Sequence, residues 1–310
     1  MRAALASIAL VGGIAHAETP RETPAAIEVD REAAPPGRVE HGFESGAPVE
    51  GWGMSVAISL LARPIALHSS TDSYPVDRRG TLGLGGVLAL GDTVVVDAKL
   101  PLANQNGSRL QGFGDPRALD RHVLGDLRFG GRIRVAGRPE RAAFVRAELS
   151  LPTGNAASFA GESSWTLAWS LIGRLTLPHD IVAAATGGIR LRGDEVIVAD
   201  KLVGDEVFGA AGALVPVTST LALTGELAAA VGDRIARKTG PSPIELRGGL
   251  VTRIVPDLII GLRAGGGLTD QIGSPTWRVT LEIAYQGSWR LIPRTAPQDH
   301  SPDADEPDEP

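Results

Sequence analysis

Arginines at alternate positions are the recurrent chemical feature of this sequence. Within residues 128–134, Arg128, Arg132 and Arg134 are separated by even steps along the chain. Successive side chains of a β-strand point to opposite faces, so these guanidinium groups share one face and apolar residues such as Phe129 occupy the other. A row of fixed cations attracts anions, repels other cations and pairs with carboxylates. The pattern therefore indicates an electrostatic task for one face of the strand.

The same polar face can be followed through the other strand-like stretches, except in residues 204–215, whose two faces cannot be told apart. Twelve basic residues occupy it: Lys99, Arg128, Arg132, Arg134, Arg146, Arg174, Arg190, Arg192, Arg247, Arg253, Arg263 and Arg278. Six acids occupy it as well: Asp97, Asp126, Glu148, Glu226, Glu245 and Glu282. The excess of basic residues predicts a surface with a positive potential.

Twelve stretches of alternating apolar and polar residues lie between Trp52 and Gln286, and they are joined by links of two kinds. The short links are residues 91–92, 137–140, 178–180, 216–218 and 255–257. The long links are residues 63–78, 102–121, 152–163, 193–203, 232–242 and 267–275. Strict alternation of short and long links is typical of bacterial outer-membrane barrels. We therefore predict an all-β, transmembrane, up-and-down antiparallel β-barrel of twelve strands, with ten or fourteen as alternatives.

The arginines decide which face meets lipid. An arginine facing hydrocarbon at the membrane midplane costs about 2–4 kcal/mol, so the basic face is expected to line the lumen. A soluble barrel with an apolar core is the alternative. The signal-like residues 1–17 and the strict alternation of short and long links both argue against it. We expect Trp52 and Tyr285 at the periplasmic rim of the membrane and Trp165 and Trp277 at the outer rim, because aromatic rings with a polar edge favour interfaces.

Four segments are predicted along the chain. Residues 1–17 resemble a signal peptide, with Arg2, a short apolar run and the site Ala15-His16-Ala17. Residues 18–50 hold eight acids and three arginines and are expected to form a disordered periplasmic segment. Residues 51–287 form the barrel, and 288–310 form a disordered acidic tail. This organisation predicts the outer membrane of a Gram-negative bacterium, with both termini in the periplasm. The absence of cysteine excludes disulfides and thiol chemistry.

Three segments together resemble a known group. They are Gly125-Asp126-Leu127-Arg128-Phe129-Gly130, Leu149-Ser150-Leu151-Pro152-Thr153-Gly154 and the hairpin over residues 248–270. They resemble outer-membrane barrels of the phenol meta-pathway transporter type and are similar to the barrel halves of some OmpA-type proteins. The resemblance covers most of residues 51–287 and implies an outer-membrane channel. No peptidoglycan-binding domain of OmpA type follows the barrel here, so wall anchoring by that route is not expected.

The expected function is passive transport of small polar or anionic solutes through an arginine-lined pore. Eight-stranded barrels are filled by side chains and barrels of sixteen strands hold open channels, so twelve strands leave two outcomes open. In one, the barrel conducts. In the other, arginines pair with Glu148, Glu226, Glu245 and Glu282 and plug the lumen, and the long loops of a structural or surface-presentation barrel bind a partner outside the cell.

Other chemistry has weaker support in the sequence. A phospholipase-like pair would need His122 and Ser150, which both carry lumen parity, so no enzyme activity is expected. Asp115, Asp120 and Asp126 do not have the spacing of a calcium loop. We expect no metal, cofactor or nucleic-acid partner. The expected partners are outer-membrane lipids and lipopolysaccharide, periplasmic chaperones, the barrel-assembly machinery and a small polar or anionic solute.

Overall fold

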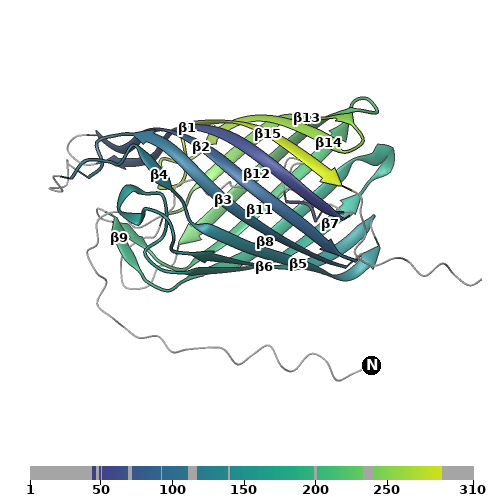
Figure 1. Ribbon diagram of the computed structural model, residues 1–310, viewed down its shortest axis with the longest axis horizontal. Coiled ribbons are helices and arrows are strands. Elements are labelled where there is room, and N and C mark those ends of the chain that lie inside the picture. Colours follow the sequence, from purple (N-terminus) through teal and green to yellow (C-terminus); the bar gives the residue numbers. More distant parts are fainter. Residues whose placement is uncertain are drawn as a thin grey trace, which may run out of the picture.

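The alternating stretches form the wall of a closed antiparallel barrel in the computed structural model (Figure 1). The structure describes residues 44–46, 49, 51–68, 72–91, 93–110, 117–138, 140–198, 201–232 and 241–287. The predicted signal peptide, the acidic tail and most of the N-terminal segment lie outside the described residues. Among the described residues, no helix is long and apolar enough to cross a membrane.

Each wall strand pairs with its neighbours in the chain, and the first pairs with the last. The strands are β1 (Trp52–His68), β2 (Asp72–Leu90), β3 (Val94–Asn106), β4 (His122–Leu124), β5 (Leu127–Arg138), β6 (Arg141–Leu151), β7 (Thr166–Thr176), β8 (Val182–Arg192), β11 (Glu206–Pro216), β12 (Leu221–Gly232), β13 (Ile244–Val255), β14 (Leu258–Gly267) and β15 (Trp277–Gly287). Both β4 and β5 pair with β3, so they act as one interrupted strand. The predicted twelve-stranded up-and-down barrel is confirmed.

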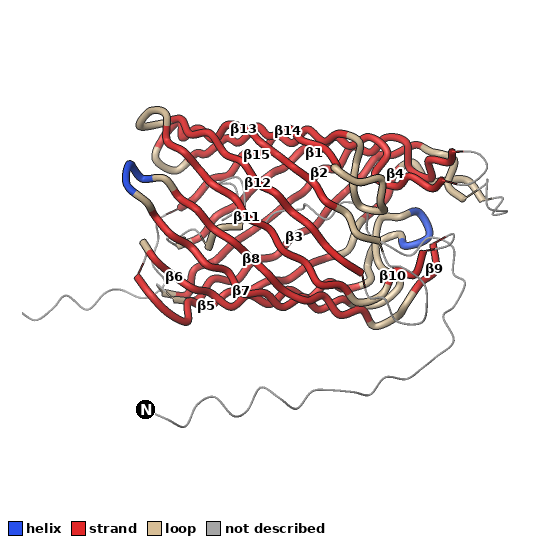
Figure 2. Tube along the Cα trace, turned by 180° about the vertical axis from the view of Figure 1, so that it is seen from behind, coloured by secondary structure: helices blue, strands red, loops and turns tan. Residues whose placement is uncertain are grey.

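The links are sorted by end, which defines a long-loop end and a short-turn end of the barrel (Figure 2). The long links contain local structure of their own, namely η2 (Ala156–Ser158) and the hairpin β9 (Val196–Val198) with β10 (Lys201–Val203). One short turn contains η3 (Pro178–Asp180). The predicted loop over residues 63–78 is wrong for most of its length, because β1 and β2 continue to His68 and Asp72. Register shifts after Ala62 carry this pairing past Pro64, a residue that usually ends a strand.

Side chains alternate between the barrel interior and the outer surface. On β1, Met54 and Ile58 are 62% and 48% exposed, whereas Ser55 and Ser59, which follow them in the chain, are buried. Residues 204–215, whose two faces the sequence did not distinguish, follow the same alternation, because Val207 on β11 points outward and Glu206 is 4% exposed. The outer surface is therefore an apolar band, and the polar residues are gathered inside.

Closure depends on the pairing of β1 with β15, which continues from Trp52–Gly287 to Ala62–Trp277 without a register shift. Inside the seam, the hydroxyls of Ser59 and Thr280 lie 3.1 Å apart and share a hydrogen bond. A closed wall leaves no unpaired strand edge, which a sheet in a bilayer requires. The position of every inward side chain then follows from its strand and parity.

The apolar band predicts a depth-dependent cost for charge. Ile58→Arg places a cation on the outer face midway along β1 and is expected to lower the free energy of unfolding by about 2–4 kcal/mol. Val255→Arg, on an exposed position at the short-turn end, is the matched control and is expected to cost about 0–1 kcal/mol. Urea unfolding of the refolded barrel in lipid vesicles measures both. Equal costs for the two variants would contradict a band centred on the middle of the wall.

Candidate functional site

Most of the predicted basic residues are removed from solvent inside the barrel. Seven are buried: Lys99, Arg128, Arg132, Arg146, Arg247, Arg263 and Arg278. Four are partly buried: Arg134, Arg174, Arg190 and Arg192. Arg253 is exposed near the turn between β13 and β14, so the structure does not bring it together with the others. That these groups line a conducting pore stays a prediction.

Neighbouring strands supply the two members of several ion pairs. Arg247 on β13 stands opposite Glu226 on β12, with 2.7 Å between Nη2 and Oε2. Arg190 on β8 pairs with Glu206 on β11. Arg263 on β14 pairs with Glu282 on β15. Register alone therefore determines these contacts, because directly opposite or diagonal side chains on one face of a sheet are within reach.

Two further pairs cross an intervening strand, and in the first of them a glycine makes room. Arg146 on β6 reaches over β5 to Asp97 on β3, with nitrogen–oxygen distances of 2.6 and 3.0 Å. A side chain at Gly130 on β5 would collide with both groups. Arg278 on β15 likewise reaches across β14 to a carboxylate on β13.

That carboxylate belongs to Glu245, whose Oε1 lies 2.8 Å from Nε of Arg278. Gly265 is the Cα partner of Arg278 on one side and of Arg247 on the other. A side chain at Gly265 would collide with the Leu246 carbonyl and with Cα and Cγ of Arg247. At Gly130, by contrast, the missing side chain extends the reach of Arg146 from the neighbouring strand to the one beyond.

Three acids beyond the six predicted for the inner face take part in these ion pairs. Glu206 lies on the stretch whose parity was undecided, and it also accepts from Arg192 at 3.4 Å. Glu162, in the link between β6 and β7, lies 3.4 Å from Arg192. Glu44, in the segment before the barrel, lies 3.4 Å from Arg132. The alternation of Glu206 with the apolar Val207 was a sequence signal for its inward position. No sequence feature marked Glu44 or Glu162 as lumen residues.

The long-loop end is crossed by an apolar cap. Its members are almost completely buried: Ile65, Val76, Leu110, Phe159, Val196, Val198, Val203 and Ile272. Ile65 and Val76 belong to the β1–β2 hairpin, whereas Val196 and Val198 belong to the β9–β10 hairpin between β8 and β11. In the ring of twelve wall strands, β1 stands six places from β8, and β2 stands six places from β11. The cap therefore joins opposite walls and spans the mouth of the barrel.

Polar contacts hold η2 beneath this cap. Three successive backbone carbonyls, those of residues 157, 158 and 159, each accept a hydrogen bond from a different long side chain. Arg109 donates to the first at 3.0 Å, Gln105 to the second at 2.6 Å and Arg79 to the third at 2.7 Å. All three donors are buried. The cap is consequently fixed by directed hydrogen bonds as well as by apolar contact.

The short-turn end receives part of the N-terminal segment. Val49 packs with Val87 and Ala89 of β2 inside the barrel, and Gly51 accepts a hydrogen bond from the Ala89 amide at 2.7 Å. Ser45 is completely buried, and the ion pair of Glu44 with Arg132 reaches deeper into the lumen. The lumen is therefore narrowed from this end as well.

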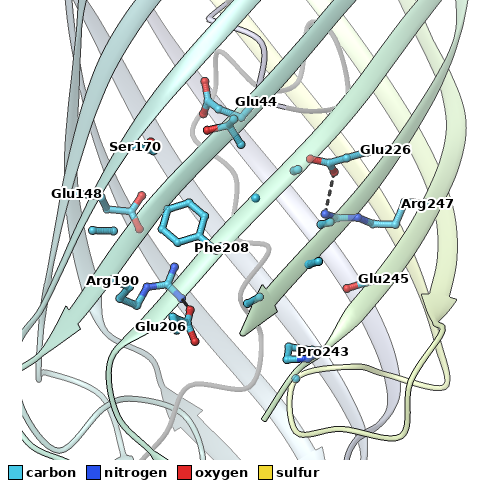
Figure 3. Close-up of a pocket in the computed structure, with 18 of the residues that line it drawn as sticks. Glu44, Glu148, Ser170, Arg190, Glu206, Phe208, Glu226, Pro243, Glu245 and Arg247 are labelled. Carbon is cyan, nitrogen blue, oxygen red and sulfur yellow. Dashed lines mark hydrogen bonds and ion pairs between the residues drawn. The ribbon is translucent and has the colours of Figure 1, made fainter. Parts of the chain in front are cut away.

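A chamber of about 190 Å³ remains between the two ends (Figure 3). Glu44 contributes to its lining from the N-terminal segment, and Gly273 contributes from the link before β15. In Figure 3 the ring of Phe208 lies among charged side chains that converge from several strands. The guanidinium of Arg190 lies 5.5 Å from the centre of that ring. The chamber combines an aromatic surface with paired charges of both signs.

The structure also places the residues that were considered for a phospholipase-like pair and for a calcium site. His122 is exposed, whereas its neighbour Val123 faces inward, so the predicted lumen parity of His122 is wrong and it lies on the opposite face of the wall from Ser150. Asp120 accepts hydrogen bonds from Asn155 and Ser158. Asp126 accepts the backbone amides of residues 154 and 162. Within the described residues no cluster of acids and histidines is arranged to hold a metal ion.

The four predicted interfacial aromatics occupy the two ends of the wall. Trp52 and Tyr285 are neighbours at the short-turn end, with ring centroids 5.7 Å apart. Trp165 and Trp277 lie at the long-loop end and are 46% and 44% exposed. Their contact with membrane interfaces stays a prediction.

Solved structures share this architecture. An outer membrane channel from Pseudomonas putida F1 superposes with a TM-score of 0.60 at 15% sequence identity, over 79% of this chain and 98% of that protein. The NanC porin gives a TM-score of 0.50 at 6% identity, over 75% of this chain and 98% of the porin. No protein-family model matches the sequence, and no curated protein matches it either. At such identities the likeness establishes the barrel fold.

Proposed function

We propose that this protein is an outer-membrane channel that takes small polar or anionic solutes through its charged lumen. The observation that carries the proposal is the chamber between the two constricted ends, because its walls present fixed charges from at least six strands. The short-turn end and both termini face the periplasm, and the long loops face the cell exterior. This placement follows the usual arrangement of short periplasmic turns and longer outer loops in such barrels.

The charge balance favours anions less strongly than the sequence suggested. Among the described residues, Arg253 is exposed and drops out of the predicted twelve cations, whereas the buried Arg79 and Arg109 join them, and Glu44, Glu162 and Glu206 join the predicted six acids. Thirteen cations therefore face nine acids. Most of these charges are paired, and a paired guanidinium attracts a passing anion less than a lone one. We therefore propose a modest anion preference.

Passage also requires motion, because the cap spans one mouth and residues 44–46 and 49 lie in the other. The proposed cycle opens the cap toward the exterior to admit a solute and displaces the N-terminal segment to release it. The cap equally supports the second candidate function, a surface-presentation barrel that does not conduct. Conductance decides between the two.

Single and double substitutions at the Arg247–Glu226 ion pair test whether ions pass through the chamber. Glu226→Gln leaves Arg247 without its carboxylate and is expected to increase anion preference, whereas Arg247→Gln is expected to decrease it. The double substitution restores the wild-type balance. The reversal potential of the purified barrel in a planar bilayer, under a potassium chloride gradient, measures each variant. Identical reversal potentials in all four proteins would place the ion path outside the chamber.

A second test addresses the cap. Val198 is completely buried in it, so Val198→Asp introduces an unpaired carboxylate into an apolar cluster. The expected result is a larger or more frequent single-channel current than in the wild type, with unchanged migration of the folded barrel on gels. Val217→Asp, at an exposed short-turn position, is the control and is expected to leave the current unchanged. Silence from the wild type and from the opened variant would favour the surface-presentation barrel.

A further inference from the structure

The outer surface of β1 to β4 changes character toward the long-loop end. One cross-strand row on this surface consists of Ile58, Leu82, Leu102 and Leu124, which are aligned by the pairing of the four strands. The next row toward the long-loop end contains Leu60, Gly80, Asn104 and His122. The row after that contains Arg78 and Asn106. Polar side chains thus replace apolar ones within two steps along the strands.

Two adjoining hollows occupy this transition. One, of about 630 Å³, extends over the apolar residues Ile58, Leu82 and Leu102. The other, of about 780 Å³, extends toward the long-loop end. They share Gly80, Asn104 and His122, so they form one continuous groove. Gly80 lies in the groove, and a methyl group there would meet only Leu60 and, more distantly, the Asn104 carbonyl.

Positive charge is concentrated at the long-loop end of this groove. Among the described residues, its lining includes Arg63, Arg78 and Arg121 but a single acid, Asp77. The side chains of Arg78 and Arg63 are 78% and 47% exposed, and Asp77 lies 3.9 and 3.4 Å from their Nε atoms. One carboxylate therefore balances part of the charge of three guanidinium groups. The groove is apolar at one end and cationic at the other.

We propose that this groove binds a phosphorylated lipid of the outer leaflet. The acyl chain lies along the leucines of the apolar hollow, and the headgroup phosphate lies among Arg63, Arg78 and Arg121. Guanidinium groups recognise phosphate through paired hydrogen bonds, and apolar contact with the wall is what an acyl chain offers. Trp277 borders the same end of the groove, at the depth that aromatic rings favour.

The inference rests on the membrane placement proposed above, since the long-loop end must reach the outer leaflet for this lipid to be available. It does not depend on conduction through the lumen. All residues of the groove that the proposal uses lie on the outer surface or in the adjoining links, away from the chamber.

Binding is measured on the full mature protein in detergent, with fluorescent lipid A carrying two phosphates as the probe. Dephosphorylated lipid A and inorganic phosphate serve as comparison ligands. We expect Arg78→Gln and Arg121→Gln each to weaken binding about fivefold, since one arginine near an anionic membrane surface has an effect of that size. Arg138→Gln, an exposed arginine at the short-turn end, is the matched charge control and is expected to leave binding unchanged.

A second pair of variants tests the hollow itself. Gly80→Leu fills the groove from its floor, where the nearest atoms belong to a flexible leucine, and is expected to reduce lipid binding about tenfold, as loss of roughly two buried methylenes would. Gly86→Leu, at an equally open position on the same face of β2, is the control. Single-channel current is expected to be unchanged in both.

The outcomes separate the proposal from its alternatives. Equal binding of lipid A with and without phosphate would overturn the role of the arginines. Equal loss of binding in the Gly80 and Gly86 variants would show only that lipid coats the whole wall, and it would overturn the groove. Loss of current with intact lipid binding would count against the channel and leave the lipid site standing.

Discussion

A guanidinium group that leaves water needs a carboxylate within reach, and the interior of this barrel meets that need repeatedly in a small volume. Removing one member of a buried pair costs about 3–5 kcal/mol, because an uncompensated charge remains. The pairs of Arg247 with Glu226 and of Arg190 with Glu206 join adjacent strands, so correct register and correct charge pairing require each other. A slip of one residue would turn the charged side chain of the slipped strand toward lipid and leave its partner unpaired in the lumen.

Glycine has a specific part in this arrangement. At Gly130 the missing side chain lets Arg146 pass over β5 and reach Asp97 on β3. This contact ties three strands together through side chains, in addition to the backbone ladder. The abundance of glycine in the sequence is therefore compatible with a rigid wall, although glycine alone weakens a strand.

The architecture could be predicted from the sequence because it depends on period-two alternation and on link lengths, which are local properties. Parity likewise predicts the face of residues such as Arg146 and Glu226. The missed features are those without a local signal. Glu44 reaches Arg132 across 88 positions of the chain, and the pairing of β1 with β2 past Pro64 depends on register shifts that no composition rule anticipates. His122 was misplaced because the break at Gly125 and Asp126 separates its parity from that of β5.

The cap unites side chains that the wall strands hold on opposite sides of the ring. Before β1 has met β15, Ile65 lies on the edge strand of an open sheet and Val196 lies six strands away near its middle, so the two have no common centre to pack against. Their burial therefore stabilises only the finished barrel, which makes closure of the seam and folding of the long links one cooperative event. During biogenesis, the time at which these links become resistant to proteolysis would report that the seam has formed.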